Sequence, residues 1–188
     1  ALYLGVKLMT SCKTKDKIFF IMWRVFNRVL VVLLVIFATA YSAPIPFLKP
    51  SFLNLKEDLE DSVREGKYLF IMFHQEGCPF CDKMRRITFQ NKDVQNYYTK
   101  HFNMVEIDIR GSLEVVDFDG KKLTERQFAL KHGVRLTPVF MFLDKKGEVI
   151  AKVPGYIEPK EFILIGRWIV EEHYKRTNLV NFLRENKK

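Results

Sequence analysis

Apolar residues form short continuous runs and several periodic segments along residues 51–188. The runs Tyr68–Phe73 and Val139–Leu143 predict central strands, because a strand covered on both faces is apolar along its whole length. Phe102–Ile109 alternates between apolar and polar residues and predicts a third strand. Glu148–Val153 follows a turn and is expected to pair back on Val139–Leu143 as a hairpin arm.

The segments between these strands have the features of helices. Asn91 and Thr124 are residues that can cap a first helical turn, and Gly66 and Gly133 are expected to end the helices that precede them. The expected helices are Phe52–Arg64, Cys81–Ile87, Asn91–His101, Thr124–His132, a long helix from Pro159 and a short one at Asn178–Arg184, and a short strand at Leu113–Phe118 precedes a turn at Asp119-Gly120.

The order of these elements predicts an α/β fold with a mixed central sheet. Helical crossovers separate Tyr68–Phe73 from Phe102–Ile109, so these two strands are expected to run parallel, and the closing hairpin adds antiparallel pairing. Open α/β sheets carry their sites outside the carboxyl ends of the strands. The residues directly after Phe73 are therefore the first place to look for chemistry.

Two cysteines lie in that place, in the sequence Cys78-Pro79-Phe80-Cys81. They follow the turn His74–Gly77 and open the expected helix, where unpaired backbone N–H groups and the helix dipole stabilise a thiolate. A strand that leads through Cys-x-x-Cys into a helix is typical of redox proteins. The alternative is half of a zinc site, but structural zinc needs a second pair of ligands, and the only other cysteine is Cys12.

Composition and charge narrow the class of protein. The chain has 188 residues, of which 48% are hydrophobic and 14% aromatic, so a packed core is expected and global disorder is excluded. The formal charge is +9, but residues 1–42 hold six of the 31 basic and one of the 22 acidic residues, which leaves +4 on the rest. That remainder has no basic stripe interleaved with aromatics, so we expect no nucleic-acid partner.

The beginning of the chain has the pattern of a signal peptide. Arg28 precedes the apolar run Val29–Ala38, and small residues follow in Thr39–Ala43, with cleavage expected after Ala40 or Ser42. The run is shorter than the roughly 20 residues that span a membrane. The alternative is an uncleaved membrane anchor, because apolar residues further upstream add length.

These features predict a division of the chain into three parts. Residues 1–42 are expected to be the leader, and residues 1–21 to be the product of a start site assigned too far upstream, since Met22 would begin a compact basic region. Residues 43–50 are expected to be a Pro-rich tether and residues 51–188 the folded domain. After cleavage the domain would be periplasmic or otherwise extracytoplasmic, and its only cysteines would be Cys78 and Cys81.

The ordered set of motifs resembles the thioredoxin-like superfamily over roughly residues 52–174. The resemblance rests on the Cys78–Cys81 motif between strand and helix, Gly133–Pro138 before an apolar strand, and Asp144–Glu148 followed by Gly155-Tyr156. It implies a three-layer α/β/α fold with a mixed central sheet. The opening Glu76–Asp82 and the insertion Val116–Thr124 look like exported bacterial thioredoxins of the SoxW type, which are found with sulfur-oxidation clusters.

The resemblance implies roles for individual residues. Cys78 would be the attacking thiolate and Cys81 the resolving thiol. The Thr137-Pro138 bond would be cis and face Cys78, leaving the backbone of Thr137 free to pair with an extended substrate segment. Thr137, Pro138, Pro79 and Phe80 would then be the substrate-binding residues. An ordinary proline at the start of a strand is the alternative for Pro138.

Nearby charged groups complete the expected site. His74 could lower the pKa of Cys78 if it lies close, and a partly buried histidine at a strand end is the alternative; Glu76 would only modulate the local field. One position departs from the family pattern, because cytosolic thioredoxins have a buried Asp where this chain has Met72. Glu106 or Asp108 could replace it as proton acceptor for Cys81, although Asp108 is the better candidate for a strand-end cap.

The sequence thus predicts an exported thiol–disulfide oxidoreductase without cofactor or metal, acting as a monomer. It would reduce protein disulfides; its partner would be a disulfide-containing protein or a small-thiol substrate, and a membrane electron donor would recharge it. The alternatives are a disulfide-forming oxidase or isomerase-like protein, and a Cu(I)-binding chaperone that uses His74 with both cysteines. Haem attachment is excluded because Asp82, not His, follows Cys81.

Overall fold

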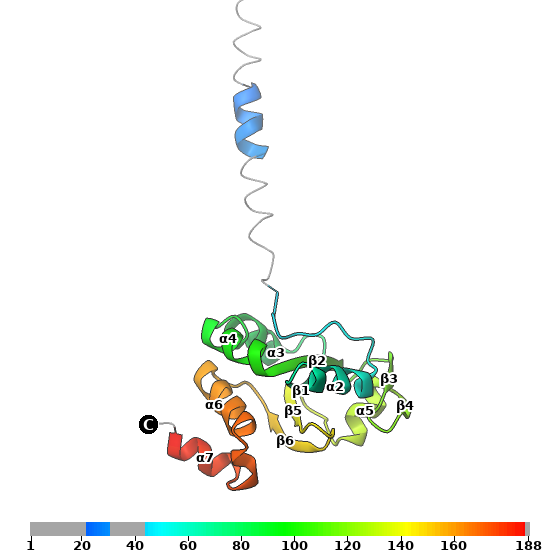
Figure 1. Cartoon of the computed structure of the whole chain (residues 1–188). Helices are drawn as coiled ribbons and strands as arrows, with labels where there is room; N and C mark the ends of the chain where they lie inside the picture. Colours follow the sequence, from blue (N-terminus) through cyan, green and yellow to red (C-terminus); the bar gives the residue numbers. More distant parts are fainter. Residues whose placement is uncertain (1–21, 31–43, 187–188) are drawn as a thin grey trace, which may run out of the picture. The chain divides into compact units, whose positions relative to one another are not determined.

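The computed structural model describes residues 22–30 and 44–186 (Figure 1). Residues 22–30 are helical, and residues 44–186 belong to a separate compact unit, the α/β domain. The expected cleavage positions and most of the apolar run of the leader lie outside the described residues. Within the described ranges, no helix combines the length and apolar character needed to cross a bilayer.

A four-stranded mixed sheet forms the centre of the domain. Its strands are β1 (Tyr68–His74), β2 (Phe102–Asp108), β5 (Val139–Leu143) and β6 (Val149–Pro154), in the order β2-β1-β5-β6. β1 runs parallel to β2 and antiparallel to β5, and β5 and β6 form the antiparallel hairpin. The predicted fold class is confirmed, including the parallel pair and the closing hairpin.

Helices cover both faces of this sheet (Figure 1). The predicted caps are confirmed: the Asn91 side chain accepts hydrogen bonds from two backbone N–H groups of α4, and Thr124 forms a capping box with Gln127 at the start of α5. The helices are α2 (Leu55–Arg64), α3 (Pro79–Lys83), α4 (Lys92–His101), α5 (Glu125–Lys131), α6 (Pro159–Val170) and α7 (Leu179–Asn186), with a 3-10 turn at His173–Lys175.

The helix after the cysteine motif differs from the regular helix predicted over Cys81–Ile87. It begins at Pro79 and becomes a π-helix at Met84–Thr88, where the Phe89 N–H donates to the Met84 carbonyl at 2.9 Å. The spacing of apolar residues in a short segment does not distinguish a π-helix, which has about one more residue per turn, from a regular α-helix. The Thr88 hydroxyl donates a hydrogen bond outside its own helix, to the Ile157 carbonyl at 2.6 Å.

The expected strand at Leu113–Phe118 is shorter in the structure and has a partner. β3 (Glu114–Val116) pairs antiparallel with β4 (Lys122–Thr124), which the sequence analysis did not anticipate. Between the strands, buried Asp117 accepts a hydrogen bond from the Phe118 N–H at 2.6 Å and pairs with Lys131 of α5. The hairpin is therefore tied to the helix that follows it.

One face of the sheet, here named the aromatic face, packs against α3, α4 and α6. Tyr98 stacks on Phe162 with ring centroids 4.2 Å apart, and its hydroxyl donates to the Phe162 carbonyl at 2.7 Å. Burial raises the pKa of Tyr98 well above its usual value, so the phenol stays protonated as a donor. The other buried rings of this face are Phe47, Phe70, Phe89, Phe102, Phe140, Phe142, Trp168 and Phe182.

The opposite face, here named the aliphatic face, packs against α2 and α5. Strand alternation places neighbouring residues on opposite faces, so Met72 belongs to the aromatic face whereas Ile71 and Phe73 belong to the aliphatic face. The buried residues of the aliphatic face include Leu55, Leu59, Leu69, Val105, Ile107, Phe128, Val139, Met141 and Leu143. Both faces are buried, and the sheet is the middle layer of three.

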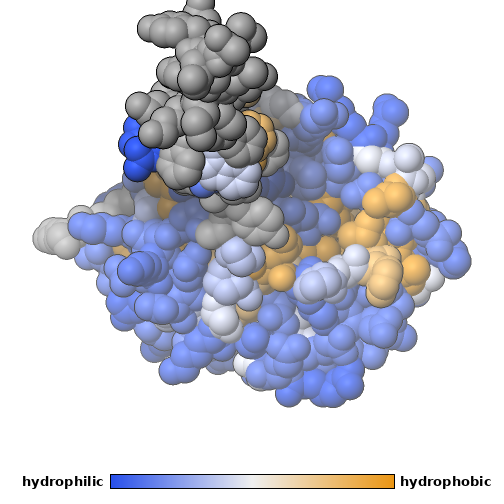
Figure 2. All heavy atoms as spheres, turned by 90° about the horizontal axis from the view of Figure 1, so that it is seen from above, coloured by the Kyte–Doolittle hydropathy of each residue, from blue (hydrophilic) through white to orange (hydrophobic). Residues whose placement is uncertain are grey.

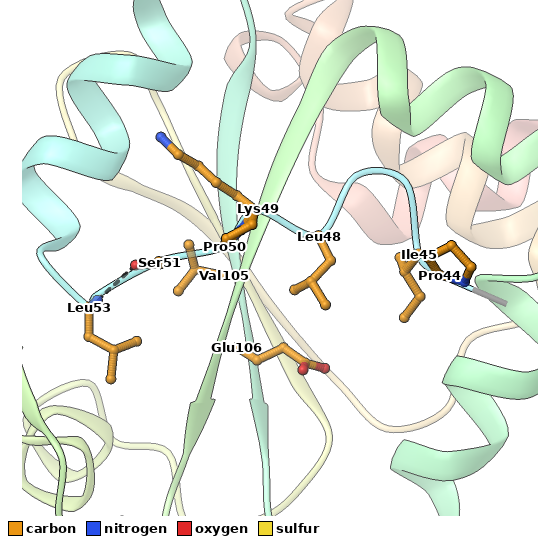
Figure 3. A pocket seen from close by; sticks show the side chains of 9 residues that line it. All are labelled: Pro44, Ile45, Leu48, Lys49, Pro50, Ser51, Leu53, Val105 and Glu106. Atoms are coloured by element: carbon orange, nitrogen blue, oxygen red, sulfur yellow. Dashed lines mark hydrogen bonds between the residues drawn. The ribbon is translucent and has the colours of Figure 1, made fainter. Parts of the chain in front are cut away.

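Residues 44–50, expected to be a tether, pack on the β2 edge of the sheet. Leu48 forms a parallel bridge with Met104, and Phe47 is buried among the rings of the aromatic face. Figure 3 shows this segment crossing β2 with Leu48 on one side and Lys49 pointing away. A hollow of about 390 Å³ lies beneath it, and its lining includes no residue of the cysteine motif or of Thr137-Pro138.

Hydrophilic residues cover most of the domain face seen from above, with apolar residues gathered in patches among them (Figure 2). Single exposed apolar side chains are ordinary on protein surfaces. Phe80, one of the predicted substrate-binding residues, is 57% exposed, and Leu136, which directly precedes Thr137, is 76% exposed; Leu130 on α5 is 51% exposed.

Candidate active site

The cysteine motif lies at the carboxyl end of β1, as its place in the sequence predicted. β1 ends at His74, and Gly77 makes the turn into α3 with a φ of 70°, a left-handed conformation that suits glycine. Cys78 is the N-cap of α3, and Pro79 occupies the first helical turn, where its missing N–H costs no hydrogen bond. The chain therefore places the Cys78 sulfur at the positive end of the helix.

Cys78 and Cys81 form a disulfide, with their Cα atoms 5.3 Å apart. The two sulfurs differ in environment. Cys78 keeps 5% of its surface exposed, whereas Cys81 is fully buried, and the Cys81 backbone N–H donates to the Cys78 sulfur at 3.1 Å. A hydrogen bond to sulfur favours the thiolate over the thiol once the disulfide is reduced. The geometry thus distinguishes the hydrogen-bonded sulfur of Cys78, which belongs to a residue with a small exposed fraction, from the sulfur of the fully buried Cys81.

The segment before β5 lies beside this motif. Phe73 of β1 pairs with Val139 of β5, which brings Pro138 level with the end of β1. The Thr137-Pro138 peptide bond is cis, Pro138 is buried and Thr137 is half-buried. The Pro138 carbonyl accepts a hydrogen bond from the Gly155 N–H at 2.8 Å, which joins this segment to the end of β6.

A third loop, after β6, holds the motif helix in place. The Ile157 N–H donates to the sulfur of buried Met84 at 3.3 Å, and the Lys83 ammonium lies 3.8 Å from the centre of the Tyr156 ring. Together with the Thr88–Ile157 hydrogen bond, these contacts fix α3 against the end of the sheet. Sequence reasoning missed the roles of Met84 and Thr88, because nothing local marks a methionine or threonine as a partner of a distant loop.

A family model for a thioredoxin-like domain matches residues 55–167. The chain belongs to the thioredoxin-like family. Solved structures agree with this assignment at the level of the fold. A thioredoxin-fold protein from Helicobacter pylori superposes with a TM-score of 0.54 and 22% identity, covering 63% of this chain and 83% of its own.

Two further structures have the same fold. A putative disulphide-isomerase from Bacteroides thetaiotaomicron superposes with a TM-score of 0.52 at 22% identity, over 69% of this chain and 98% of its own. A thioredoxin from Thermus thermophilus superposes with a TM-score of 0.50 at 22% identity, over 62% of this chain and 84% of its own. A search of curated protein sequences gives no match.

In this thioredoxin-like domain, the predicted pKa modulators lie between the end of β1 and the cysteine motif. His74 is half-buried at the end of β1, and its backbone carbonyl accepts a hydrogen bond from the Ile109 N–H at 2.9 Å. Within the described residues, the His74 side chain forms no hydrogen bond or ion pair, and Glu76 is exposed on the turn. Pro79 and Phe80, by contrast, are exposed directly beside Cys78.

Met72, at the position where the resemblance led us to expect a buried Asp in cytosolic thioredoxins, is fully buried in the same cluster as both cysteines. Glu106 is its neighbour on β2, and the Arg85 guanidinium donates to the Glu106 carboxylate at 2.8 and 3.1 Å. Asp108 accepts a hydrogen bond from the Arg110 N–H at 2.8 Å, the strand-end cap that the sequence suggested. Both candidate carboxylates therefore already have partners.

No cluster of three or more His, Cys, Asp or Glu side chains suited to a metal occurs within residues 22–30 and 44–186. His74, Cys78 and Cys81 accordingly do not come together as a three-ligand set there. Among the described residues, the thioredoxin-like domain also offers the cysteines no second ligand pair of the kind that structural zinc needs. What the arrangement can do chemically is exchange disulfides.

Proposed function

We propose that this protein is a thiol–disulfide oxidoreductase that reduces disulfides in protein substrates. The observation that carries the proposal is the asymmetry of the Cys78–Cys81 pair. Cys78, at a helix N-terminus, keeps 5% of its surface exposed and its sulfur accepts a backbone hydrogen bond, whereas Cys81 is fully buried. Attack needs an accessible thiolate, and resolution needs a second thiol held within bonding distance.

The reaction consists of two exchanges at sulfur. In the reduced protein, the Cys78 thiolate attacks one sulfur of the substrate disulfide, so a Cys78–substrate bond forms and the other substrate sulfur leaves and takes up a proton. The Cys81 thiol then loses its proton and attacks the Cys78 sulfur, which forms the Cys78–Cys81 disulfide and releases the second substrate thiolate. Two electrons pass from the protein to the substrate.

The surroundings of Cys78 support binding of an extended substrate segment. Pro79 and Phe80 are exposed next to Cys78 in the sequence. Thr137 is half-buried in the segment before β5, which lies level with the carboxyl end of β1. A substrate strand would pair with the Thr137 backbone while its cysteine reaches Cys78. Phe80, which is 57% exposed, would supply apolar contact.

The setting of this activity is also part of the proposal. The signal-peptide pattern of residues 28–43 supports an exported, extracytoplasmic protein, with an uncleaved anchor as the variant. A dithiol there needs a source of electrons, so a membrane electron donor would reduce the Cys78–Cys81 disulfide after each turnover. The motif and the β3–β4 insertion favour a protein like the exported thioredoxins of the SoxW type, acting as a monomer.

The test is reduction of insulin disulfides by the purified domain with dithiothreitol as electron source. Wild type should accelerate the precipitation of insulin chains, and Cys78→Ser should match the rate without protein. Equal rates for wild type and Cys78→Ser would exclude the proposal. The direction of electron flow follows from the reduction potential of the pair: a value near −270 mV, as in thioredoxin, supports a reductase, and one near −120 mV selects a disulfide-forming oxidase.

A further inference from the structure

Beside the proposed active site lies a cavity of about 440 Å³, here named the arginine groove. Its walls come from three segments: the loop after β2, helix α5, and the loop that leads from α5 to Thr137-Pro138. Three of its six lining residues are arginines and the other three are apolar: Ile109, Arg110, Arg126, Leu130, Val134 and Arg135. No acidic side chain is among the described residues that line it.

The groove lies at the same edge of the sheet as the cysteines. β1 and β2 are parallel and in register to their ends, where His74 pairs with Asp108, and the Ile109 N–H donates to the His74 carbonyl at 2.9 Å. On the other side, Arg135 stands two residues before Thr137. An extended segment bound along Thr137 would therefore reach the groove without crossing the protein.

Among the residues that the structure describes, the three guanidinium groups have no ion-pair partner. Arg110, Arg126 and Arg135 are exposed, and no described side chain forms a hydrogen bond or ion pair with their guanidinium groups. Arg85, on the aromatic face, is bound to Glu106. Unpaired arginines that converge on one hollow create a local positive potential and offer forked donors that match carboxylates.

The groove is held in shape by buried contacts. The Glu125 carboxylate, itself buried, accepts hydrogen bonds from the Asp108 N–H at 3.0 Å and the Leu113 N–H at 3.4 Å, and the Arg126 N–H donates to the Gly111 carbonyl at 3.1 Å. Gly111 is required, because a Cβ there would overlap the Glu125 carboxylate. These bonds keep the Arg110 turn against the start of α5, where Arg126 lies.

Apolar surface accompanies the charge. Arg126 and Leu130 are four residues apart on α5 and so share one face of the helix. Leu130 is 51% exposed and Leu136, between the groove and Thr137, is 76% exposed. A ligand that suits this surface has carboxylates separated by apolar or backbone spacing, as an extended acidic peptide has.

We propose that the arginine groove binds an acidic segment that flanks the reactive cysteine of a disulfide-bonded protein substrate. The proposal rests on the proposed function, and it adds selectivity: the cysteines react, and the arginines favour disulfides with Asp or Glu nearby. Exposed charge pairs each contribute little, so the three together are expected to favour an acidic over a neutral segment by about tenfold at low ionic strength.

The first test measures binding without chemistry. Two labelled peptides of equal length, each with its cysteine replaced by serine, carry either Asp and Glu or Asn and Gln on one flank, and fluorescence anisotropy gives their affinities. Wild type should bind the acidic peptide about tenfold more tightly, and the difference should shrink as NaCl is added. Equal affinities would overturn the proposal whether or not the protein reduces disulfides.

The second test uses matched triple variants. R110Q/R126Q/R135Q removes the groove charges, and R64Q/R176Q/R184Q removes three exposed arginines elsewhere, so both change the net charge equally. Only the groove variant should lose the preference for the acidic peptide. Loss of the preference in both variants would show that net charge alone steers the peptide and would overturn the proposal.

The third test separates the two proposals. The corresponding disulfide-containing peptides are reduced with wild type and the groove variant, and KM and kcat are compared. The groove variant should raise KM about tenfold for the acidic disulfide and leave the neutral disulfide unchanged. If wild type reduces both peptides at the same kcat/KM, the groove proposal fails and the reductase stands. If neither peptide is reduced while acidic binding persists, the reductase fails and the groove stands.

Glutathione disulfide, a small anionic substrate, is measured in the same way. If the groove variant raises KM for glutathione disulfide and not for the acidic peptide disulfide, the groove does not bind a protein segment and the proposal is wrong.

Discussion

The two faces of the sheet are both buried, yet they contribute differently to the site. The aromatic face carries the motif helix, and its core includes Cys78, Cys81 and the rings around Tyr98. The aliphatic face carries α2 and α5, and its core is mostly leucine, isoleucine and valine. The exposed side of α5 contributes to the arginine groove.

The difference indicates that reactivity and recognition are anchored separately. Large rings bury much area and pack in defined geometries, so they hold α3 and its disulfide in one position. The aliphatic face fixes α5 equally well but places no chemistry in its core. A substitution in either core should therefore lower stability. A substitution near the cysteines on the aromatic face should also affect turnover, and one on the exposed side of α5 should affect substrate choice.

The largest expected effect is on the aromatic face, at the buried sulfur. Cys81→Ser removes the resolving thiol but leaves Cys78, so each molecule should react once with a disulfide substrate and stop as a mixed disulfide. Mass spectrometry of the non-reduced protein measures the adduct. Cys78→Ser is the control and should form none. Continued turnover by Cys81→Ser would show that the buried sulfur is not needed.

Stability compares the two cores directly. Phe162→Ala on the aromatic face should cost about 3–5 kcal/mol, and Leu55→Ala on the aliphatic face about 2–5 kcal/mol, because both side chains are fully buried. Val180→Ala, at a 65% exposed position of α7, should cost less than about 0.5 kcal/mol. Urea unfolding measures all three. A Phe162→Ala cost below that of Val180→Ala would contradict the packing described.

Removing a helix cap should lower the unfolding free energy equally on the two faces, and by less than the core substitutions do. Asn91→Ala removes the cap of α4 and Thr124→Ala that of α5, and each should lower the unfolding free energy by about 1 kcal/mol. Thr99→Ala, at an exposed position within α4, is the control. A loss at Thr124 but none at Asn91 would mean that the rings alone hold α4.

The smallest expected effect is the pH dependence of two histidines, one associated with each face. Burial lowers the pKa of His101, which lies on the Tyr97 ring, and of His132, which lies on the Phe128 ring. Below about pH 6.5 the unfolded chain takes up the proton first, so stability falls as pH is lowered from there through the depressed folded pKa.

Removing each histidine should flatten this slope. His132→Phe should flatten it more than His101→Phe, since Nε2 of His132 is buried without a hydrogen-bond partner among the described residues. Urea unfolding between pH 7.5 and 5 checks the order. If the wild-type protein gained stability on acidification in this range and His132→Phe lost that gain, folding would raise the pKa of His132 and the prediction would be wrong.

Much of the fold was predictable because it depends on local patterns of apolar, polar and capping residues. Apolar runs and alternation identified the four strands of the sheet, and Asn91 and Thr124 marked helix starts that the structure confirms. The Cys78–Cys81 spacing predicted a bonded pair, which the structure contains. The π-helix at Met84–Thr88 and the burial of Phe47 were not predicted, because both depend on contacts with distant residues.

The amino-acid sequence by itself determined which segments become strands and helices, and where two sulfurs can meet, since those properties depend on residues two to four positions apart. Only the tertiary structure decided that Ile109 lies against His74, that Ile157 holds Met84, and that arginines from three separate segments face one hollow. These neighbours are set by the parallel register of β1 and β2 and by the packing of α5, which local spacing does not encode.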